Sequence, residues 1–184
     1  ISGFLKGKRI KYIKNIITRP LKDSVKENIF NILRHSNSIK IKIEKANVLD
    51  LYSGIGSFGI ECISRGADNV TFIENSKNTS KILKENLLDL SILSKSEVYN
   101  SKIEEVLNKK NFNKKFNVFF FDPPFKDDLF LKNLKLIKEK KLFEIKNIVI
   151  IHREKKTSDN LNNLIKVIAT KVYGRSKIIF GFLT

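Results

Sequence analysis

The chain has 184 residues, 41% of them hydrophobic, which suits one compact domain and excludes a disordered chain. Its 36 Lys and Arg residues outnumber its 19 Asp and Glu residues, and the formal net charge of +17 makes polyanions the expected partners. No apolar run approaches the roughly 18 residues of a membrane span, so no membrane association is expected, and the single cysteine, Cys62, excludes an internal disulfide.

The composition also bears on where the protein works. A single cysteine fits a reducing cytosol, and the N-terminus lacks the apolar stretch and cleavage site of a signal peptide, so we expect a cytoplasmic protein. The sequence contains no methionine, so we expect residues to precede Ile1. A coding bias toward Lys, Asn and Ile explains part of the charge, but not why the first acid, Asp23, follows a run of basic residues.

Residues 1–45 are expected to form a basic, RNA-contacting arm and a helix. A β-prone stretch over 9–17 ends at Pro20, which lacks an N–H donor. Asp23 is the predicted N-cap of an amphipathic helix over 24–34. The candidate contacts to nucleic acid are the basic side chains of the arm, Lys6, Lys8, Arg9, Lys11 and Arg19.

Residues 46–184 alternate between strand and helix patterns and form the predicted main domain. Strands are expected over 46–51, 70–74, 97–100, 116–122 and 147–153, and helices over 57–64, 77–90, 103–107 and 129–138. The segments 165–173 and 177–183 read as a terminal hairpin around Gly174. This order predicts an α/β fold with a mostly parallel sheet covered on both faces, whose ligands bind beyond the carboxyl ends of the strands.

A glycine-rich loop follows the first of these strands. The segment 50–59 contains Gly54, Gly56 and Gly59 in the pattern G-x-G-x-x-G, directly after a strand and opening a helix. Glu74 ends the next strand, about 20 residues on, where an acid can accept hydrogen bonds from ribose hydroxyls. The pattern therefore predicts a nucleotide-like cofactor.

The pattern by itself fits either a dinucleotide or S-adenosylmethionine, and the residues around it favour the second. Asp50 places a carboxylate where a pyrophosphate would be repelled but the cationic amino-acid part of S-adenosylmethionine would be attracted. Tyr52 lies between this acid and the first glycine, whereas dinucleotide loops usually reach that glycine at once. We therefore predict S-adenosylmethionine, with S-adenosylhomocysteine as product, and include Asp50 and Tyr52 among its contacts.

A second motif, Asp122-Pro123-Pro124-Phe125, follows the apolar strand over 116–122. The prolines stiffen the backbone and remove two N–H donors, which leaves carbonyl acceptors with little freedom. Asp122 and the Pro123 carbonyl can each accept one N–H of an amine on a flat ring, and Phe125 can stack on that ring. The motif predicts methyl transfer to an exocyclic amine of a base, accelerated mainly by positioning.

These features together resemble the RsmD family of bacterial methyltransferases that modify a guanine N2 amine of 16S ribosomal RNA. The resemblance extends over nearly the whole chain, from residues 1–8 through 18–33, the glycine loop and 122–125 to Tyr173-Gly174. It implies a Rossmann-like class I methyltransferase fold: a seven-stranded sheet with an antiparallel last strand, plus a short basic N-terminal extension. It also implies 16S ribosomal RNA, within an assembling small subunit, as substrate.

The chain departs from the family in two places. Ser24 and Lys26 stand where the family usually has arginines, which weakens the inference of RNA contacts from this helix. Near Asn100 and Ser101, many relatives of the fold carry an acid for the cofactor's adenine, and here there is none. Backbone groups or the Asn100 side chain are the alternatives, and we assign the contact to Asn100 and Ser101. We expect a monomer.

Other residues invite functional interpretations that the sequence does not support. The two histidines, His35 and His152, have no Cys or carboxylate cluster at ligand spacing, so no metal is expected. We expect 152–154 to be a solvated strand end, and Cys62 to lie in the core. The alternatives to guanine N2 methylation are methylation of adenine N6 in RNA or DNA, a nicotinamide-dependent oxidoreductase, and a non-catalytic RNA-binding factor.

Overall fold

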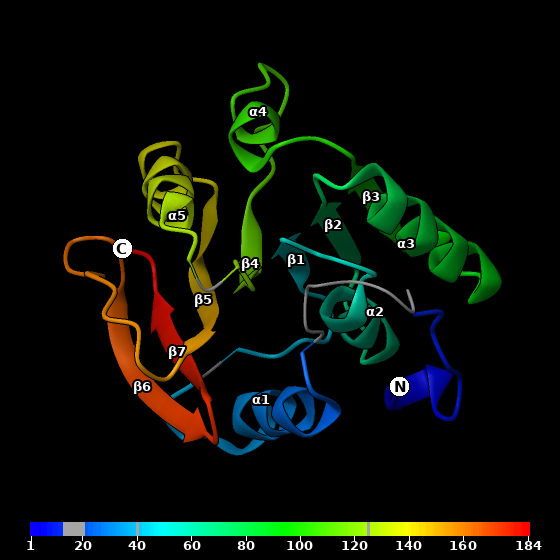
Figure 1. The fold of residues 1–184 in the computed structure, drawn as a ribbon, viewed down its shortest axis with the longest axis horizontal. Coiled ribbons are helices and arrows are strands. Elements are labelled where there is room, and N and C mark those ends of the chain that lie inside the picture. The colour runs from blue at the N-terminus through cyan, green and yellow to red at the C-terminus, as the bar shows by residue number, and fades with distance from the viewer. Residues whose placement is uncertain (13–20, 40, 125) are drawn as a thin grey trace.

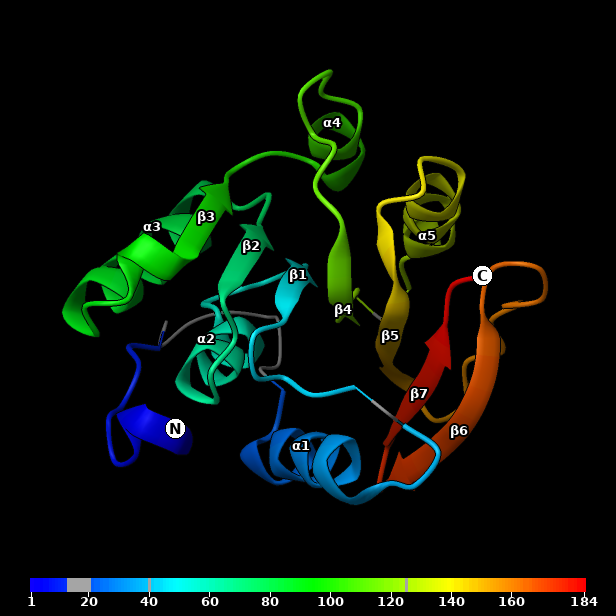
Figure 2. The same ribbon diagram turned by 180° about the vertical axis from the view of Figure 1, so that it is seen from behind.

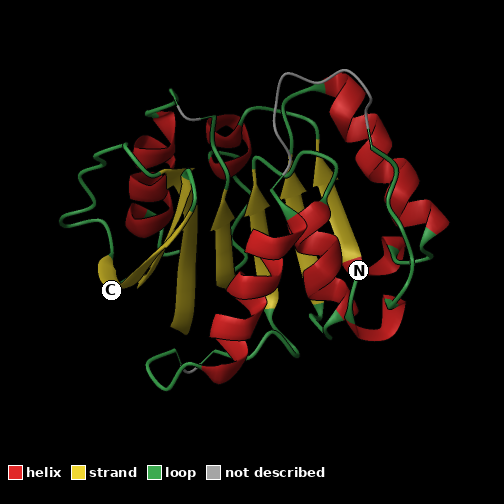
Figure 3. Cartoon of the chain, turned by 60° about the horizontal axis from the view of Figure 1, so that its bottom comes forward, coloured by secondary structure: helices red, strands yellow, loops and turns green. Residues whose placement is uncertain are grey.

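The structure is a computed structural model that describes residues 1–12, 21–39, 41–124 and 126–184. Its centre is a seven-stranded sheet with the order β3-β2-β1-β4-β5-β7-β6 and helices on both sides (Figures 1 and 3). The strands are β1 (Asn47–Leu51), β2 (Asn69–Ile73), β3 (Ser96–Tyr99), β4 (Phe116–Phe121), β5 (Phe143–Glu154), β6 (Lys166–Tyr173) and β7 (Ser176–Phe182). The helices are α1 (Asp23–His35), α2 (Ser57–Ser64), α3 (Lys77–Asp89), α4 (Ile103–Leu107) and α5 (Leu129–Glu139), with short 3-10 turns at Gly3–Leu5 and Leu93–Lys95.

The strand directions confirm the predicted fold class. Strands β1 to β5 pair in parallel, β7 runs antiparallel to both β5 and β6, and β6 forms the edge of the sheet. The parallel strands alternate with helices that cross the sheet faces, as the sequence pattern required. Their carboxyl ends meet along one edge, where ligands of such sheets bind.

Alternating side chains divide the core into two layers. One layer packs α1, α2 and α3 against one face of the sheet, with Phe72 and Phe120 among its buried residues. The other packs α4 and α5 against the opposite face, with Phe121 and Phe130 among its buried residues. Phe120 and Phe121 are neighbours in β4, so this strand is buried on both faces, which explains its continuous apolar sequence. Cys62 is fully buried in the first layer, as expected.

Two predictions for the N-terminal region need correction. Asp23 is not the N-cap of α1 but its first residue; Lys22 occupies the cap position, and the Asp23 carboxylate accepts a hydrogen bond from Lys26 Nζ instead. The β-prone stretch is not a strand over residues 9–12, because the Lys11 N–H donates to the side chain of Asn86 in α3. The rest of that stretch, including Arg19 and Pro20, lies outside the described residues.

The described part of the basic arm lies beside α2 and α3 (Figure 2). The Leu5 N–H donates to Ser64 Oγ at 2.9 Å, and the Lys11 N–H donates to Asn86 Oδ1 at 2.7 Å. Asn86 also donates to the carbonyls of Lys11 and Ile55, so one buried amide connects the arm to the glycine loop. In the described ranges, no helix is long and apolar enough to cross a membrane.

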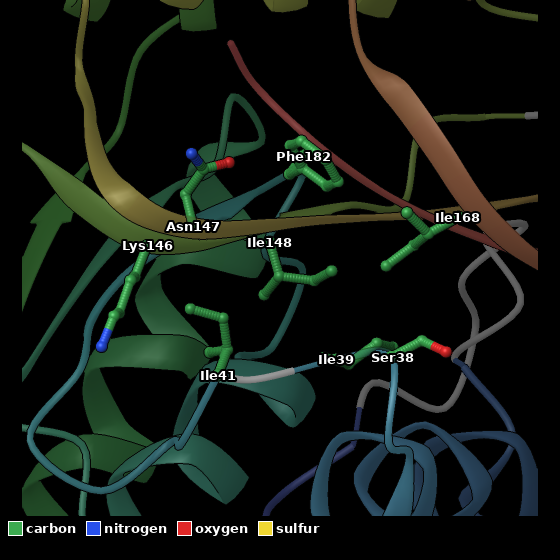
Figure 4. Close-up of a pocket in the computed structure, with 8 residues that line it drawn as sticks. All are labelled: Ser38, Ile39, Ile41, Lys146, Asn147, Ile148, Ile168 and Phe182. Atoms are coloured by element: carbon green, nitrogen blue, oxygen red, sulfur yellow. The ribbon is translucent and has the colours of Figure 1, made fainter.

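A small hollow of about 120 Å³ opens at the start of β5 (Figure 4). Ile41 and Ile148 point toward each other across it, and Phe182 of β7 closes one side. It borders the first residues of the buried part of β5, whereas the predicted site lies beyond the last residues of the parallel strands. This hollow is therefore separate from the predicted cofactor site.

Candidate active site

Strand register brings the two sequence motifs to one edge of the sheet. Leu51, the last residue of β1, pairs with Ile73 of β2 on one side and with Phe121 of β4 on the other. The next residues of those strands, Glu74 and Asp122, therefore flank the end of β1. Neighbouring strands lie about 4.8 Å apart, so the backbones of these two acids are separated by about 10 Å. A ligand over the end of β1 can reach both.

The three glycines of the loop differ in what surrounds them. Gly54 has φ +57°, and a Cβ there would meet no atom within 4 Å, so its surface is open. At Gly56, with φ +88°, a Cβ would come within 2.4 Å of Leu83. At Gly59 a Cβ would lie 2.3 Å from the ring of Phe72, so this glycine allows α2 to pack closely on β2. Space for a ligand is thus found beside Gly54.

Asp50 lies beneath the loop, with 1% of its surface exposed. Its Oδ2 accepts a hydrogen bond from the Gly59 N–H at 2.9 Å, which fixes the start of α2. Its Oδ1 is buried and accepts no hydrogen bond from the part of the chain that the structure describes. Burial raises the pKa of the Asp50 carboxyl well above its usual range, and the charges of Asp122 and Glu74 raise it further. Its predicted contact with the cofactor stays a prediction.

Glu74 is held by backbone N–H groups. Its Oε2 accepts from the Gly54 N–H at 2.8 Å, and its Oε1 accepts from the Ser76 N–H at 2.7 Å. A carboxylate offers about four lone-pair positions, so Glu74 keeps capacity for two hydroxyl donors. The Asn100 side chain donates to the Glu74 carbonyl at 2.8 Å, and the Ser101 hydroxyl donates to Glu105. Glu74, Gly54 and Asn100 are therefore close together, which fits a nucleoside ligand.

Tyr52 links the glycine loop to α5. Its φ is +61°, and its hydroxyl oxygen accepts a hydrogen bond from Asn133 Nδ2 at 3.3 Å. Burial raises the pKa of the Tyr52 phenol, and the nearby charge of Asp127 raises it further. The phenol is therefore neutral over the physiological range. The structure thus gives Tyr52 a role in holding the loop, and its predicted cofactor contact is untested.

Two consecutive residues of β5 contact the Asp-Pro-Pro segment. His152 Nδ1 lies 2.7 Å from Asp122 Oδ1. Arg153 Nη1 donates to the Pro124 carbonyl at 3.1 Å, and the same carbonyl accepts the Asp127 N–H at 2.8 Å. Pro123 is buried and Pro124 is exposed, while Phe125, the predicted stacking residue, lies outside the described residues. The segment is therefore supported from β5.

The expectation of a solvated strand end at 152–154 is wrong for its first two residues. His152 and Arg153 are 6% and 1% exposed, respectively. Arg153 forms two hydrogen bonds of 3.0 Å with the Asp159 carboxylate, and its guanidinium lies 4.6 Å from the Phe130 ring centroid. Sequence reasoning missed both residues, although their place at the carboxyl end of a central parallel strand was a signal.

The basic residues have different environments. Lys6, Lys8 and Arg9 are exposed on the arm, and Arg19 lies outside the described residues. Lys11 is also exposed but forms ion pairs with Asp89 at 2.9 Å and Glu85 at 3.5 Å. Part of its charge is therefore balanced within the protein.

Lys26 of α1 is directed inward rather than toward solvent. Its ammonium donates to Asp23 and to Ser57 Oγ at 3.1 Å, at the start of α2. This position, where the family usually has an arginine, therefore connects two helices. In the described ranges, no three His, Cys, Asp or Glu side chains gather into a group that could hold a metal ion.

The sequence is similar to a known protein family along almost its whole length. The sequence model of a family described as "Conserved hypothetical protein 95" matches residues 1–181. A protein of Buchnera aphidicola named ribosomal RNA small subunit methyltransferase D is 34% identical over 159 residues, which cover 86% of this chain and 78% of that protein. The protein of the same name from Haemophilus influenzae is 32% identical over 156 residues, which cover 84% of this chain and 78% of that protein.

Solved structures show the same fold. A protein of Escherichia coli assigned as a methyltransferase superposes with a TM-score of 0.82 at 24% identity, covering 98% of this chain and 94% of that one. An RNA methyltransferase of Salinibacter ruber, solved in complex with S-adenosyl-L-homocysteine, superposes with a TM-score of 0.66 at 13% identity. The superposition covers 90% of this chain and 93% of that one. The family match over almost the whole sequence and the relatives above 30% identity show that the chain belongs to the RsmD family.

Proposed function

We propose that the protein transfers a methyl group from S-adenosylmethionine to the exocyclic N2 amine of a guanine in 16S ribosomal RNA. The observation that carries the proposal is the placement of Glu74 and Asp122 on either side of the end of β1. Glu74 can accept hydrogen bonds from ribose hydroxyls, and Asp122 can accept a hydrogen bond from an amine. The names of the relatives, ribosomal RNA small subunit methyltransferase D, support the class of substrate. We further propose that a monomer acts on an assembling small subunit.

The residues around the glycine loop fit S-adenosylmethionine. Glu74 would hold the ribose, since its carboxylate has unused lone pairs. The open surface at Gly54 allows close approach of a ligand to the backbone. Asp50 lies beneath the place proposed for the amino-acid part, whose positive charge would favour the ionised form of this carboxyl against the raised pKa. Asn100 and Ser101 are assigned to the adenine. When bound, S-adenosylmethionine supplies a methyl group on a positively charged sulfur.

The Asp-Pro-Pro segment fits the acceptor amine. Asp122 would accept one N–H of the amine, and the Pro123 carbonyl would accept the other. The Pro124 carbonyl already accepts two hydrogen bonds within the protein, so it is not available. Asp122 would also lie beside the proton that the nitrogen must lose when it receives the methyl group. Phe125 would stack on the base, a contact typically worth about 1–3 kcal/mol.

The decisive test is methylation of its proposed substrate. Small subunits from cells that lack the enzyme are incubated with labelled S-adenosylmethionine, and the labelled nucleotide is mapped. Label at a guanine N2 of 16S RNA is expected, whereas label at an adenine N6, or none, would contradict the proposal. Free 16S RNA is tested in parallel and should accept less label than subunits.

A pair of matched variants tests the role of Asp122. Asp122→Ala is expected to abolish methyl transfer while leaving S-adenosylmethionine binding nearly intact. Asp128→Ala is the control, because it removes an exposed carboxylate six residues further on that forms no side-chain cap of α5. Full activity of Asp122→Ala would remove the proposed mechanism.

The proposed role of residues 1–45 in RNA binding has its own test. Replacing Lys6 and Lys8 by Gln should weaken binding and reduce the slope of log affinity against log salt by about two, one for each lost phosphate contact. The control replaces Lys135 and Lys140, at α5 on the opposite face of the sheet, by Gln. If the Lys6/Lys8 variant and the Lys135/Lys140 variant change the affinity and the salt slope equally, the arm is not the RNA contact.

A further inference from the structure

His152 stands next to Asp122 because of the register between two parallel strands. Phe121 of β4 pairs with Ile151 of β5, so the following residues, Asp122 and His152, lie side by side at the carboxyl edge. His152 Nδ1 is 2.7 Å from Asp122 Oδ1. The imidazole is 8% exposed and the carboxylate 24% exposed, so the ring is shielded from water while part of the carboxylate remains accessible.

The far side of the imidazole is held as well. His152 Nε2 lies 2.9 Å from Ser176 Oγ, at the start of β7. An ionised carboxylate can only accept hydrogen bonds, so with Asp122 ionised, Nδ1 carries a proton and donates it. The serine hydroxyl can either donate or accept, so it suits the neutral and the protonated ring alike. The ring is therefore fixed at both nitrogens, between the catalytic motif and the terminal hairpin.

We propose that His152 is a positioning residue for methyl transfer: its Nδ1–H holds Asp122 Oδ1 so that Oδ2 remains directed to the substrate amine. This inference rests on the proposed function. Rotation about the last torsion of an aspartate has a broad, shallow profile, so a carboxylate needs a partner to keep one orientation. A displacement of about 1 Å in a reacting geometry can lower the rate by about 100-fold. The hydrogen bond to His152 supplies that partner.

Two substitutions of His152 distinguish the effect of its hydrogen bond to Asp122 from the effect of having any polar side chain at this position. Asparagine carries its amide nitrogen at the same number of bonds from Cβ as histidine Nδ1, so His152→Asn keeps a donor to Asp122. Glutamine carries its amide nitrogen at the position of Nε2, so His152→Gln keeps the reach to Ser176 and loses the donor to Asp122. Both variants are neutral and polar, and both leave Asp122 itself unchanged.

The experiment measures kcat and KM for methylation of small subunits by the full chain, with S-adenosylhomocysteine affinity and thermal unfolding as checks on folding. His152→Asn is expected to retain kcat within about threefold, and His152→Gln to lose about 10- to 100-fold in kcat with KM nearly unchanged. Equal kcat values for the two variants would overturn the proposal. So would a loss confined to KM.

A double-mutant cycle shows whether His152 acts through Asp122. In an Asp122→Asn background, His152→Gln should cause no further loss beyond about twofold, because the Oδ2 acceptor that His152 directs to the amine has been replaced by an NH2 donor. Additive losses would overturn the proposal.

Ser176→Ala removes the far partner of the ring without touching Asp122, and it remains informative if a His152 variant does not fold. It should lower kcat about threefold to tenfold, the effect of one lost hydrogen bond, and an unchanged kcat would count against the proposal. If the wild-type chain methylates no guanine, the proposed function is refuted. If the wild-type chain is active but the variants behave otherwise than expected, only the role of His152 is refuted.

Discussion

Asp159→Ala is expected to be among the most destabilising substitutions near the site. The carboxylate of Asp159 and the guanidinium of Arg153 are 5% and 1% exposed, and two hydrogen bonds of 3.0 Å join them. Removing the acid leaves a guanidinium that is buried without its counter-charge. Breaking one side of such a pair costs about 3–5 kcal/mol, which is a large part of the stability of an ordinary domain.

The expected size can be measured by thermal unfolding. A chain of this length loses about 2–4 °C in Tm for each kcal/mol, so Asp159→Ala should lower Tm by about 6–20 °C. Arg153→Met combined with Asp159→Ala removes both charges and should recover part of this loss. The double variant should still methylate poorly, because the Pro124 carbonyl has lost its donor from Arg153.

The neighbouring ion pair provides a control. Arg175 and Glu154 approach to 3.5 Å, with side chains 83% and 29% exposed. Such a pair contributes about 0–1 kcal/mol, so Glu154→Ala should change Tm by at most a few degrees. If Asp159→Ala costs no more than Glu154→Ala, or if the double variant is less stable than the single one, the assignment of a buried, mutually dependent pair is refuted.

Three further changes test the support of the glycine loop. Gly59→Ala should cost about 1–3 kcal/mol of unfolding free energy, measured in urea, because the new methyl overlaps the Phe72 ring, and no loss would mean that α2 can move away. The stability of Asp50→Asn relative to the wild type should increase as pH rises above about 4. The folded-state pKa of Asp50 is raised, so the stability that the protonated Asp50 carboxyl gives the wild type is lost as pH rises. A pH-independent difference between the two proteins would contradict this. Asn86→Ala should increase proteolysis of the arm, as it removes three hydrogen bonds; unchanged cleavage would show that the arm is held elsewhere.

Local sequence patterns were sufficient to predict most of the fold. The apolar runs in β4 and β5 are long enough for buried parallel strands, and the helices between strands show regular apolar spacing. Gly66, at φ +95°, follows the end of α2, a position that favours glycine. These features depend on residues close in sequence, so a single sequence records them directly.

The two motifs of the site were also predictable, because each lies at the end of its own strand. What the sequence could not show was their surroundings. The contact between Asp122 and His152 depends on β5 lying next to β4 and on the register of that pairing. The contact of Lys26 with Ser57 was likewise not predicted, because it depends on α1 packing beside the start of α2. Contacts between distant segments set these roles, and no local pattern encodes them.

The chemistry of the Asp-Pro-Pro segment explains why it depends on β5. Two prolines supply no N–H donors, so the segment cannot be fixed through its own backbone donors at those positions and must be held by its acceptors. Consecutive residues of a strand point to opposite faces. Here His152 forms a hydrogen bond with Asp122 Oδ1, and Arg153 donates a hydrogen bond to the Pro124 carbonyl. In the proposed function, Asp122 Oδ2 and the Pro123 carbonyl accept the two N–H groups of the amine. The selectivity for an amine would then be set jointly by the motif and by two residues about 30 positions later in the chain.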